Sequence, residues 1–187
     1  MKLIHNFGVN DLAGSSSTRI YNLWRSIIER CYSEKSFARH PSYRVCEVSE
    51  QFKMLSGFSN WCENQIGFGR DGWELDKDLL IKGNKEYHPE KCVFLPRELN
   101  GFLRTRKKAR GKYPIGVTTG RHGAIVAQLS NKKERIYLGQ FTTPELAFYA
   151  YKETKEKMIK DMANKYKNHI DPRAYAALMN YQVEITD

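Results

Sequence analysis

The chain has 187 residues, and its 31 Lys and Arg against 21 Asp and Glu give a formal net charge of +10. This length allows one sizeable domain or two small ones. A strongly cationic chain suits a polyanion such as a phosphate backbone, because each neutralised phosphate releases a condensed counterion. A merely solvated cationic surface is the alternative. No run approaches eighteen uninterrupted apolar residues, and the N-terminus is too polar for a signal peptide, so we expect neither a membrane span nor export.

The cysteines also argue for a cytosolic setting. Cys31, Cys46, Cys62 and Cys92 lie far apart, without a C-x-x-C pair. Structural zinc sites usually use such close pairs, so no zinc is expected. A disulfide framework would require export. We therefore expect four buried, reduced thiols.

Hydrophobic periodicity predicts two helices in the first third of the chain. Apolar residues recur at three- and four-residue steps over 18–32, and again over 50–65, where Ser49 is the expected N-cap. Between these helices the polar, proline-containing segment 33–43 is predicted to be a loop, followed by a short strand around 44–48.

The next elements are predicted from alternation and from turn residues. We expect strands at 73–81 and 91–95, joined by a turn at 82–85, and then a helix through about residue 103 with Pro96 in its first turn. Two or three short strands follow over 113–141. A long helix to residue 166 begins at a capping box, Thr142 to Glu145, and a last short helix covers 173–181. The inward stripe of the long helix is expected at Ala147, Tyr151, Thr154, Met158, Met162 and Tyr166.

The predicted C-terminal strands have one apolar and one polar face. The apolar face is expected to lie under the long helix, which leaves the polar face open to solvent. A ribbon of two or three strands fits the major groove of DNA, about 12 Å wide, where Arg and Lys read guanine and Gln reads adenine. A solvated sheet face is the alternative. The candidate DNA-binding residues on this face are Arg121, His122, Gln128, Lys132, Lys133, Arg135 and Tyr137.

A basic run directly precedes these strands. Six of the nine residues from 104 to 112 are Lys or Arg, a concentration that repels itself unless it is solvated or paired with phosphates. We expect it to be a linker that follows the DNA backbone. Its candidate phosphate contacts are Arg104, Arg106, Lys107, Lys108, Arg110 and Lys112.

The segment from Gly116 to Tyr151 resembles the Apetala-two/ethylene-response DNA-binding domain over about 50 residues. The matching residues are Gly116-Val117, Ala127-Gln-Leu129, Tyr137-Leu-Gly139-Gln-Phe141-Thr-Thr-Pro-Glu145-Leu-Ala147 and Ala150-Tyr151. The resemblance implies a three-stranded antiparallel sheet packed on one long helix, with double-stranded DNA as the partner. The plant domains carry more arginine and tryptophan on their strands, so their sequence preference is not transferred.

A second resemblance covers Leu75 to Asn100, which looks like the ββα-metal core of an HNH endonuclease. The resemblance implies that Asp76 is the metal carboxylate, that Asn100 is the helix ligand and that Asn84 holds the turn. Oxygen ligands suit Mg²⁺ or Mn²⁺, which would stabilise the leaving oxygen of a phosphodiester.

This chain departs from the HNH pattern at the position of the water-activating histidine. Lys77 stands there, and a lysine is a poor base unless its pKa is strongly depressed. We therefore expect Lys77 to contact phosphate rather than to accept a proton. His88 is the nearest imidazole in sequence and is the candidate replacement, although a lone histidine in a turn is commonly a surface residue.

Together the two resemblances indicate a bacteriophage HNH endonuclease of the homing type, acting in the cytoplasm of the bacterial host. The expected fold class is α+β, with helices and the HNH-like core in 1–103, the basic linker in 104–112 and the DNA-binding domain in 113–187. Catalysis would involve Asp76, Lys77, His88 and Asn100. A DNA-binding regulator or accessory factor with an inactive core is the alternative, as is a phage counter-defence protein that binds a host protein.

Overall fold

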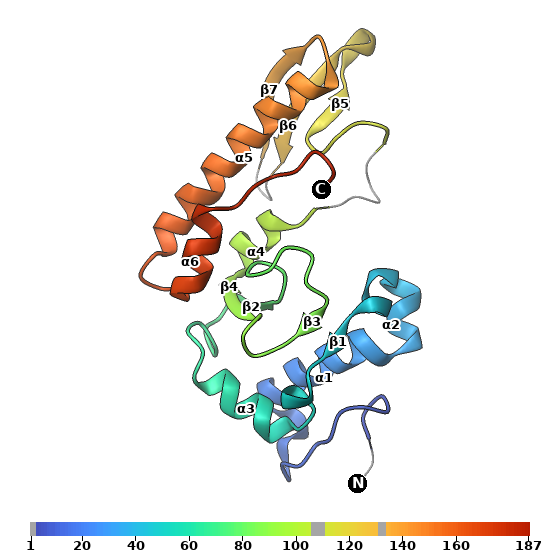
Figure 1. Cartoon of the computed structure of the whole chain (residues 1–187), viewed down its shortest axis with the longest axis vertical. Coiled ribbons are helices and arrows are strands. Elements are labelled where there is room, and N and C mark those ends of the chain that lie inside the picture. The colour runs from blue at the N-terminus through green and yellow to red at the C-terminus, as the bar shows by residue number, and fades with distance from the viewer. Residues whose placement is uncertain (1–2, 106–110, 131–133) are drawn as a thin grey trace. The chain divides into compact units, whose positions relative to one another are not determined.

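The computed structural model describes residues 3–105, 111–130 and 134–187, and its fold is α+β (Figure 1). The chain divides into two compact units. The first contains Met1–Pro96 and His169–Ala174, and the second contains Arg97–Asn168 and Tyr175–Asp187. The helix α4 (Arg97–Leu103) therefore belongs to the second unit, whereas we had predicted it as part of the N-terminal segment 1–103.

The first unit is built around α1 (Arg19–Tyr32), which confirms the predicted first helix. The Thr18 side chain accepts a hydrogen bond of 3.1 Å from the Tyr21 amide and so caps the helix. The buried face of α1 consists of Trp24, Ile27, Ile28 and Cys31. This stripe forms the centre of the larger hydrophobic core.

The predicted helix over 50–65 is wrong at its start. The structure has a 3-10 turn, η3 (Glu50–Phe52), and then a shorter helix, α3 (Leu55–Glu63). Extended backbone at Met54 separates them. The Val9 amide donates to the Lys53 carbonyl at 2.9 Å and the Leu55 amide donates to the Val9 carbonyl at 3.0 Å. The N-terminal segment thus takes the backbone groups that a continuous helix would have used.

The loop predicted for 33–43 is also wrong. Its residues form α2 (Glu34–Arg39) and the start of a 3-10 helix, η2 (Pro41–Val45). The Arg44 guanidinium joins the two, because it lies 5.1 Å from the Phe37 ring centroid and 3.3 Å from the Glu34 carboxylate. The strand expected around 44–48 is reduced to β1 (Glu47–Val48), which pairs in parallel with β3 (Glu86–Tyr87).

A short antiparallel hairpin completes the first unit. It pairs β2 (Trp73–Asp76) with β4 (Val93–Pro96), so the strand predicted over 73–81 ends early, at Asp76. The Asp76 carboxylate accepts the amides of Asp78 and Leu79 at 2.9 and 2.7 Å, which turns the chain out of the strand. Pro96 is the last strand residue rather than part of the helix, and α4 begins at Arg97.

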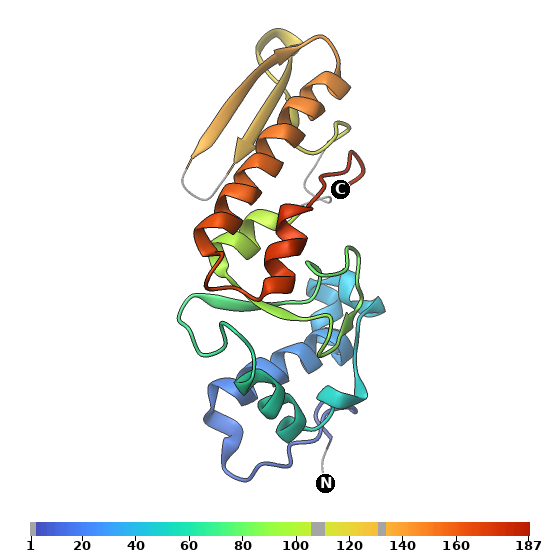
Figure 2. The same cartoon turned by 60° about the vertical axis from the view of Figure 1, so that its left-hand side comes forward.

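The second unit contains a three-stranded antiparallel sheet with the long helix α5 (Pro144–Tyr166) across one face (Figures 1 and 2). The strands are β5 (Val117–Thr119), β6 (Ile125–Ser130) and β7 (Arg135–Phe141), with β6 in the middle. This arrangement is the one predicted. The core between sheet and helix contains Ile115, Leu129, Phe148, Tyr151 and Val183, and the last helix is α6 (Pro172–Met179).

Two details of α5 differ from the prediction. Thr143, not Thr142, is the N-cap, and its hydroxyl accepts from the Leu146 amide at 3.3 Å. The buried stripe begins as expected and then continues in steps of four, so Lys155 rather than Thr154 faces inward. The Lys155 stem is buried, and its ammonium lies 5.8 and 5.6 Å from the ring centroids of Phe102 and Tyr151. The buried residues are Ala147, Phe148, Tyr151, Lys155, Ile159 and Ala163.

All four cysteines are free and buried, which confirms that prediction. Burial raises the pKa of the Cys31 and Cys92 thiols to about 12. No helix among the described residues combines the length and the apolar character needed to cross a membrane.

Candidate nucleic-acid interface and hairpin site

The sheet of the second unit has an uncovered side opposite α5. Residues directly opposite each other in an antiparallel ladder point to the same side. Val126 pairs with Thr118 on one neighbour and with Gln140 on the other, and Gln128 pairs with Tyr137. Together with Arg135, which pairs with Ser130, these side chains form what we call the open face: Thr118, Val126, Gln128, Arg135, Tyr137 and Gln140.

A β-bulge in β7 determines which residues reach the open face. Ala127 pairs with Gly139 but Gln128 pairs with Tyr137, so Leu138 is an extra residue without its own partner. Gly139 has a φ of 126°, which an L side chain rarely adopts. Regular alternation from Arg135 and Tyr137 would have placed Gly139 on the open face. The bulge places Gln140 there instead.

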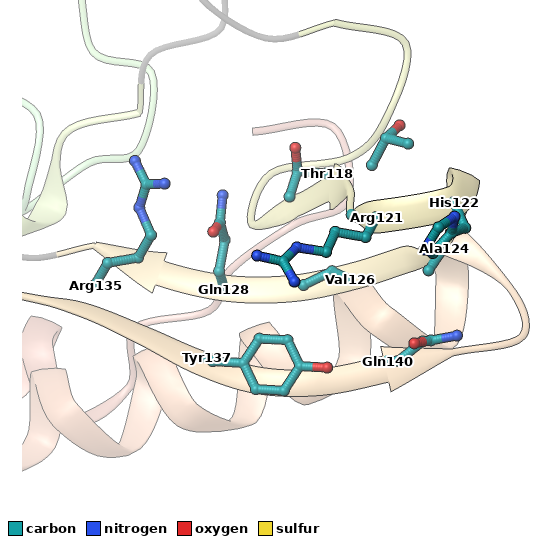
Figure 3. Close-up of a pocket in the computed structure, with 11 residues that line it drawn as sticks. Thr118, Arg121, His122, Ala124, Val126, Gln128, Arg135, Tyr137 and Gln140 are labelled. Atoms are coloured by element: carbon teal, nitrogen blue, oxygen red, sulfur yellow. The ribbon is translucent and has the colours of Figure 1, made fainter.

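The turn between β5 and β6 carries cationic side chains to the open face. The turn is closed by a 2.7 Å hydrogen bond from the Gly120 amide to the Ala124 carbonyl. His122 and Gly123 both have positive φ, at 54° and 80°, which makes the reversal tight. In Figure 3 the Arg121 side chain extends from this turn along the open face in the direction of Gln128.

The turn and the open face together enclose a groove of about 530 Å³. Its lining combines apolar surface with basic, hydroxyl and amide side chains, and none of the described residues that line it is a carboxylate. Tyr137 is 65% exposed on β7, whereas Val126 on β6 is buried and adds an apolar side chain to the lining. An exposed aromatic ring beside two arginines and two amides is chemically suited to a nucleic-acid surface.

The structure brings together five of the predicted DNA-binding residues, namely Arg121, His122, Gln128, Arg135 and Tyr137. Arg104 and Lys112 are exposed and are not part of the groove lining. The other candidates lie outside the described residues: Arg106, Lys107, Lys108, Arg110, Lys132 and Lys133.

Sequence reasoning missed three polar side chains of the groove. These are Thr118 and Thr119 on β5 and Gln140 on β7. Gln140 was missed because strict alternation assigns it to the helix side. A glycine within an otherwise regular strand pattern is a known sign of a bulge, and Gly139 was the available signal.

The second predicted site lies in the β2–β4 hairpin of the first unit, where Asp76 ends β2. Burial raises the pKa of the Asp76 carboxyl above its ordinary value, although the Leu79 amide and Lys77 oppose the shift. Perturbed carboxyls are common at functional sites, and they also occur in purely structural networks.

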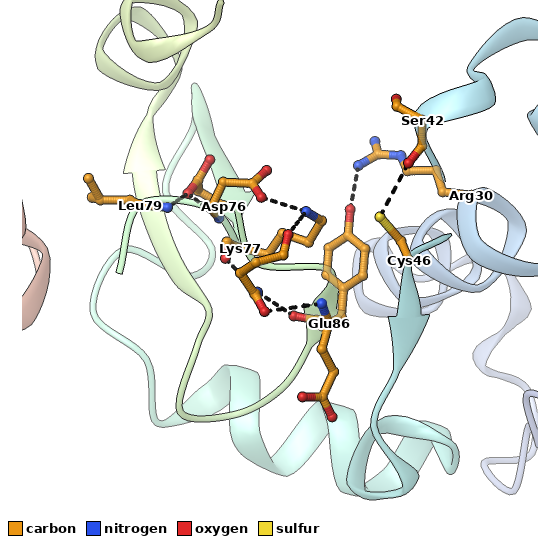
Figure 4. A network of polar contacts seen from close by, with 10 residues as sticks. Arg30, Ser42, Cys46, Asp76, Lys77, Leu79 and Glu86 are labelled. Carbon is orange, nitrogen blue, oxygen red and sulfur yellow. Dashed lines mark hydrogen bonds and ion pairs between the residues drawn. The ribbon is translucent and has the colours of Figure 1, made fainter. Parts of the chain in front are cut away.

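Lys77 is held inside the hairpin by its own network (Figure 4). Its side chain is 6% exposed, and its ammonium donates to the Asp78 carboxylate at 2.6 Å and to the Asn84 carbonyl at 2.8 Å. Burial alone would lower the pKa of Lys77, but the hydrogen bond and charge of Asp78 outweigh it and raise the pKa. Lys77 is therefore protonated near neutral pH and is unsuited to accept a proton.

The amide of Asn84 closes the same loop. Its Nδ2 donates to the carbonyls of Lys77 and Glu86, both at 2.7 Å, and its Oδ1 accepts from the Glu86 amide at 3.1 Å. These bonds hold the turn in the way that the resemblance implied for this residue.

The other two residues of the predicted catalytic set are His88 and Asn100. His88 follows β3, and its Nδ1 accepts from the Glu90 amide at 3.2 Å, which favours the tautomer protonated on Nε2. Asn100 is buried on α4, in the second unit. The structure thus groups Asp76 and Lys77 in one hairpin of the first unit, whereas Asn100 belongs to the second unit.

The hairpin is a poor match to the proposed Mg²⁺ site. One oxygen of Asp76 already accepts two backbone amides, and the buried Lys77 ammonium lies close enough to lower the pKa of this carboxyl. A fixed cation at this place would repel a divalent metal. Among residues 3–105, 111–130 and 134–187, no group of three or more His, Cys, Asp or Glu side chains is arranged to hold a metal ion.

Comparison of the chain with protein-family models, with curated proteins and with solved structures found no match. The candidate sites therefore rest on the residues, the geometry and the charges described above.

Proposed function

We propose that this protein binds double-stranded DNA through the open face of its three-stranded sheet. The observation that carries the proposal is the groove, which Arg121, Arg135 and Tyr137 line together and in which none of the described lining residues is a carboxylate. A soluble sheet needs no such cluster for stability, because α5 already covers the apolar side.

The dimensions of a three-stranded sheet support a duplex partner. Adjacent strands lie about 4.8 Å apart, so the outer strands are separated by about 10 Å, close to the roughly 12 Å width of the major groove. The net charge of +10 would attract the duplex before contact is made.

The test is a binding titration with duplex DNA at fixed salt. Both phage and host DNA fragments are suitable probes, because the host cytoplasm is the proposed place of action. We expect Arg121→Ala and Arg135→Ala each to weaken binding by about 1–3 kcal/mol if the guanidinium contacts a base pair. Arg25→Ala is the matched control, because Arg25 is an exposed arginine on α1 in the other unit. Unchanged affinity in both groove variants would reject the open face as the interface.

Metal-dependent cleavage of DNA is the second candidate function. The observation that favours it is Asp76, a carboxyl with a raised pKa at the end of β2, at the position that the HNH resemblance assigns to the metal ligand. The protonated Lys77 and its network favour the alternative, a DNA-binding protein with an inactive hairpin.

Incubation with supercoiled plasmid and Mg²⁺ or Mn²⁺ separates the two candidates. Nicking or linearisation that is lost in Asp76→Ala and Asn100→Ala would support the endonuclease. Intact plasmid with every metal, together with normal DNA retardation, would leave DNA binding as the function.

A further inference from the structure

The side chains of the open face differ in how far they are exposed, and this difference affects which of them can discriminate between DNA sequences. Arg121, Arg135 and Gln140 are exposed, whereas Gln128 is half-buried in the middle strand. A partly packed side chain loses less freedom on binding than an exposed one and is therefore better suited to discriminate between ligands.

The bulge fixes the surroundings of Gln128. The shift in register lies between Ala127 and Gln128, and it sets Gln128 directly opposite Tyr137. Bulges commonly re-aim side chains next to functional sites. Figure 3 shows Gln128 on β6 and Tyr137 on the neighbouring strand β7, with the Arg121 side chain extending from the turn toward Gln128.

We infer that Gln128 is the specificity-determining residue of the open face and that it reads an adenine in the major groove. This inference rests on the proposed DNA-binding function and deepens it. A glutamine amide both donates and accepts, which matches the N7 acceptor and the N6 amino donor of adenine in a bidentate pair. The Tyr137 ring beside it offers an apolar surface to the 5-methyl group of a neighbouring thymine.

The arginines have a different role in this arrangement. Arg135 lies at the start of β7 and Arg121 lies on the turn, so both come from ends of strands rather than from the middle of the face. Most arginine contacts with DNA go to phosphates, where they position the protein without reading sequence. Loss of an arginine should therefore weaken binding to all duplexes alike, whereas loss of Gln128 should change the preference.

The experiment is selection of bound duplexes from a random library by the full-length protein, followed by titrations with the selected site. We expect a fixed adenine in that site. Replacing it with 7-deazaadenine removes the N7 acceptor and should weaken binding by the wild type about 5- to 100-fold. Gln128→Ala removes both hydrogen bonds of the pair, so it should weaken binding to the unmodified site at least as much and should no longer distinguish the two duplexes.

Two further variants make the result specific. Gln128→Glu has the same shape but only accepts hydrogen bonds, so it should move the preference at that position from adenine to cytosine. Gln51→Ala is the control, since Gln51 is an exposed glutamine in the first unit. Selection of sites without a fixed adenine, or continued discrimination against 7-deazaadenine by Gln128→Ala, would overturn the inference while DNA binding stands. Failure of the wild type to bind any duplex would overturn both.

Discussion

Gly116 lies where the chain entering β5 passes directly over the ring of Tyr151. A Cβ at this position would come within 2.1 Å of ring atoms, and the backbone φ is 80°. We expect Gly116→Ala to lower the free energy of unfolding by at least about 2 kcal/mol, because clash and backbone strain add. Gly123→Ala separates the two causes, since Gly123 also has a φ of 80° but nothing lies within 4 Å of its added Cβ. Equal losses in urea titrations of the two variants would show that strain alone matters.

Asp76 gives a prediction about pH. A carboxyl whose pKa rises on folding costs stability once it is ionised; this cost is absent below the unfolded pKa, grows between the unfolded and the folded pKa, and is complete above the folded pKa. Asp76→Asn keeps the acceptor oxygen for the Asp78 and Leu79 amides and removes the buried charge. We therefore expect the variant to be more stable than the wild type at pH 7 and equal to it near pH 3. A stability gain that accompanies loss of any nuclease activity would mark Asp76 as functional.

The N-cap of α5 gives a prediction about the contribution of one helix to the free energy of unfolding. Thr143 caps the helix through the Leu146 amide, whereas the sequence pattern assigned the cap to Thr142. Thr143→Ala should cost about 1 kcal/mol in the free energy of unfolding. Thr142→Ala, one residue earlier on an exposed position, should cost clearly less in the same thermal or urea titration. A larger loss of stability in Thr142→Ala than in Thr143→Ala would show that Thr142 is the N-cap, as the sequence pattern predicted.

The elements that could be predicted from the sequence are those whose caps, apolar stripes and hydrogen-bond partners lie close together along the chain. The helix α1 has its cap and its apolar stripe within one segment, and the sheet with α5 follows from alternation and periodicity. The break between η3 and α3 was not predictable, because Val9, far away in the sequence, takes the backbone hydrogen bonds of Lys53 and Leu55. The inward position of Lys155 was not predicted, because a charged residue is normally assigned to the exposed face of a helix. In the structure the Lys155 ammonium lies near the rings of Phe102 and Tyr151.

The candidate site was predictable to a similar degree. Arg121, Gln128 and Tyr137 were identified from alternation on the strands, but Gln140 required the bulge, whose register depends on the pairing of β6 with β7. The raised pKa of Lys77 depends on the burial of its side chain and on the position of Asp78 in the folded turn, and no spacing rule in the sequence predicts either.

At the scale of the whole molecule, the net charge of +10 predicts strongly salt-dependent binding. Replacing the six basic residues of the run 104–112 with glutamine should weaken binding to every duplex and reduce the slope of log K against log salt by up to about 5 units. The sequence preference should not change. The measurement is a set of titrations between 50 and 200 mM salt, as an order-of-magnitude range for resolving such slopes. A changed preference would mean that the run reads bases.

The division of the chain into units has a mechanical consequence. The first unit includes His169–Ala174 from near the C-terminus, where Arg173 donates to the Glu90 carbonyl at 3.2 Å and Ile170 is buried. The chain therefore returns to its first unit after completing most of its second. Protease cleavage within the basic run should leave two fragments that remain associated under native conditions and separate only in denaturant. The N-terminal fragment would keep residues 97–103, which belong to the second unit, and the C-terminal fragment would keep residues 169–174, which belong to the first, so each fragment would contribute to both units.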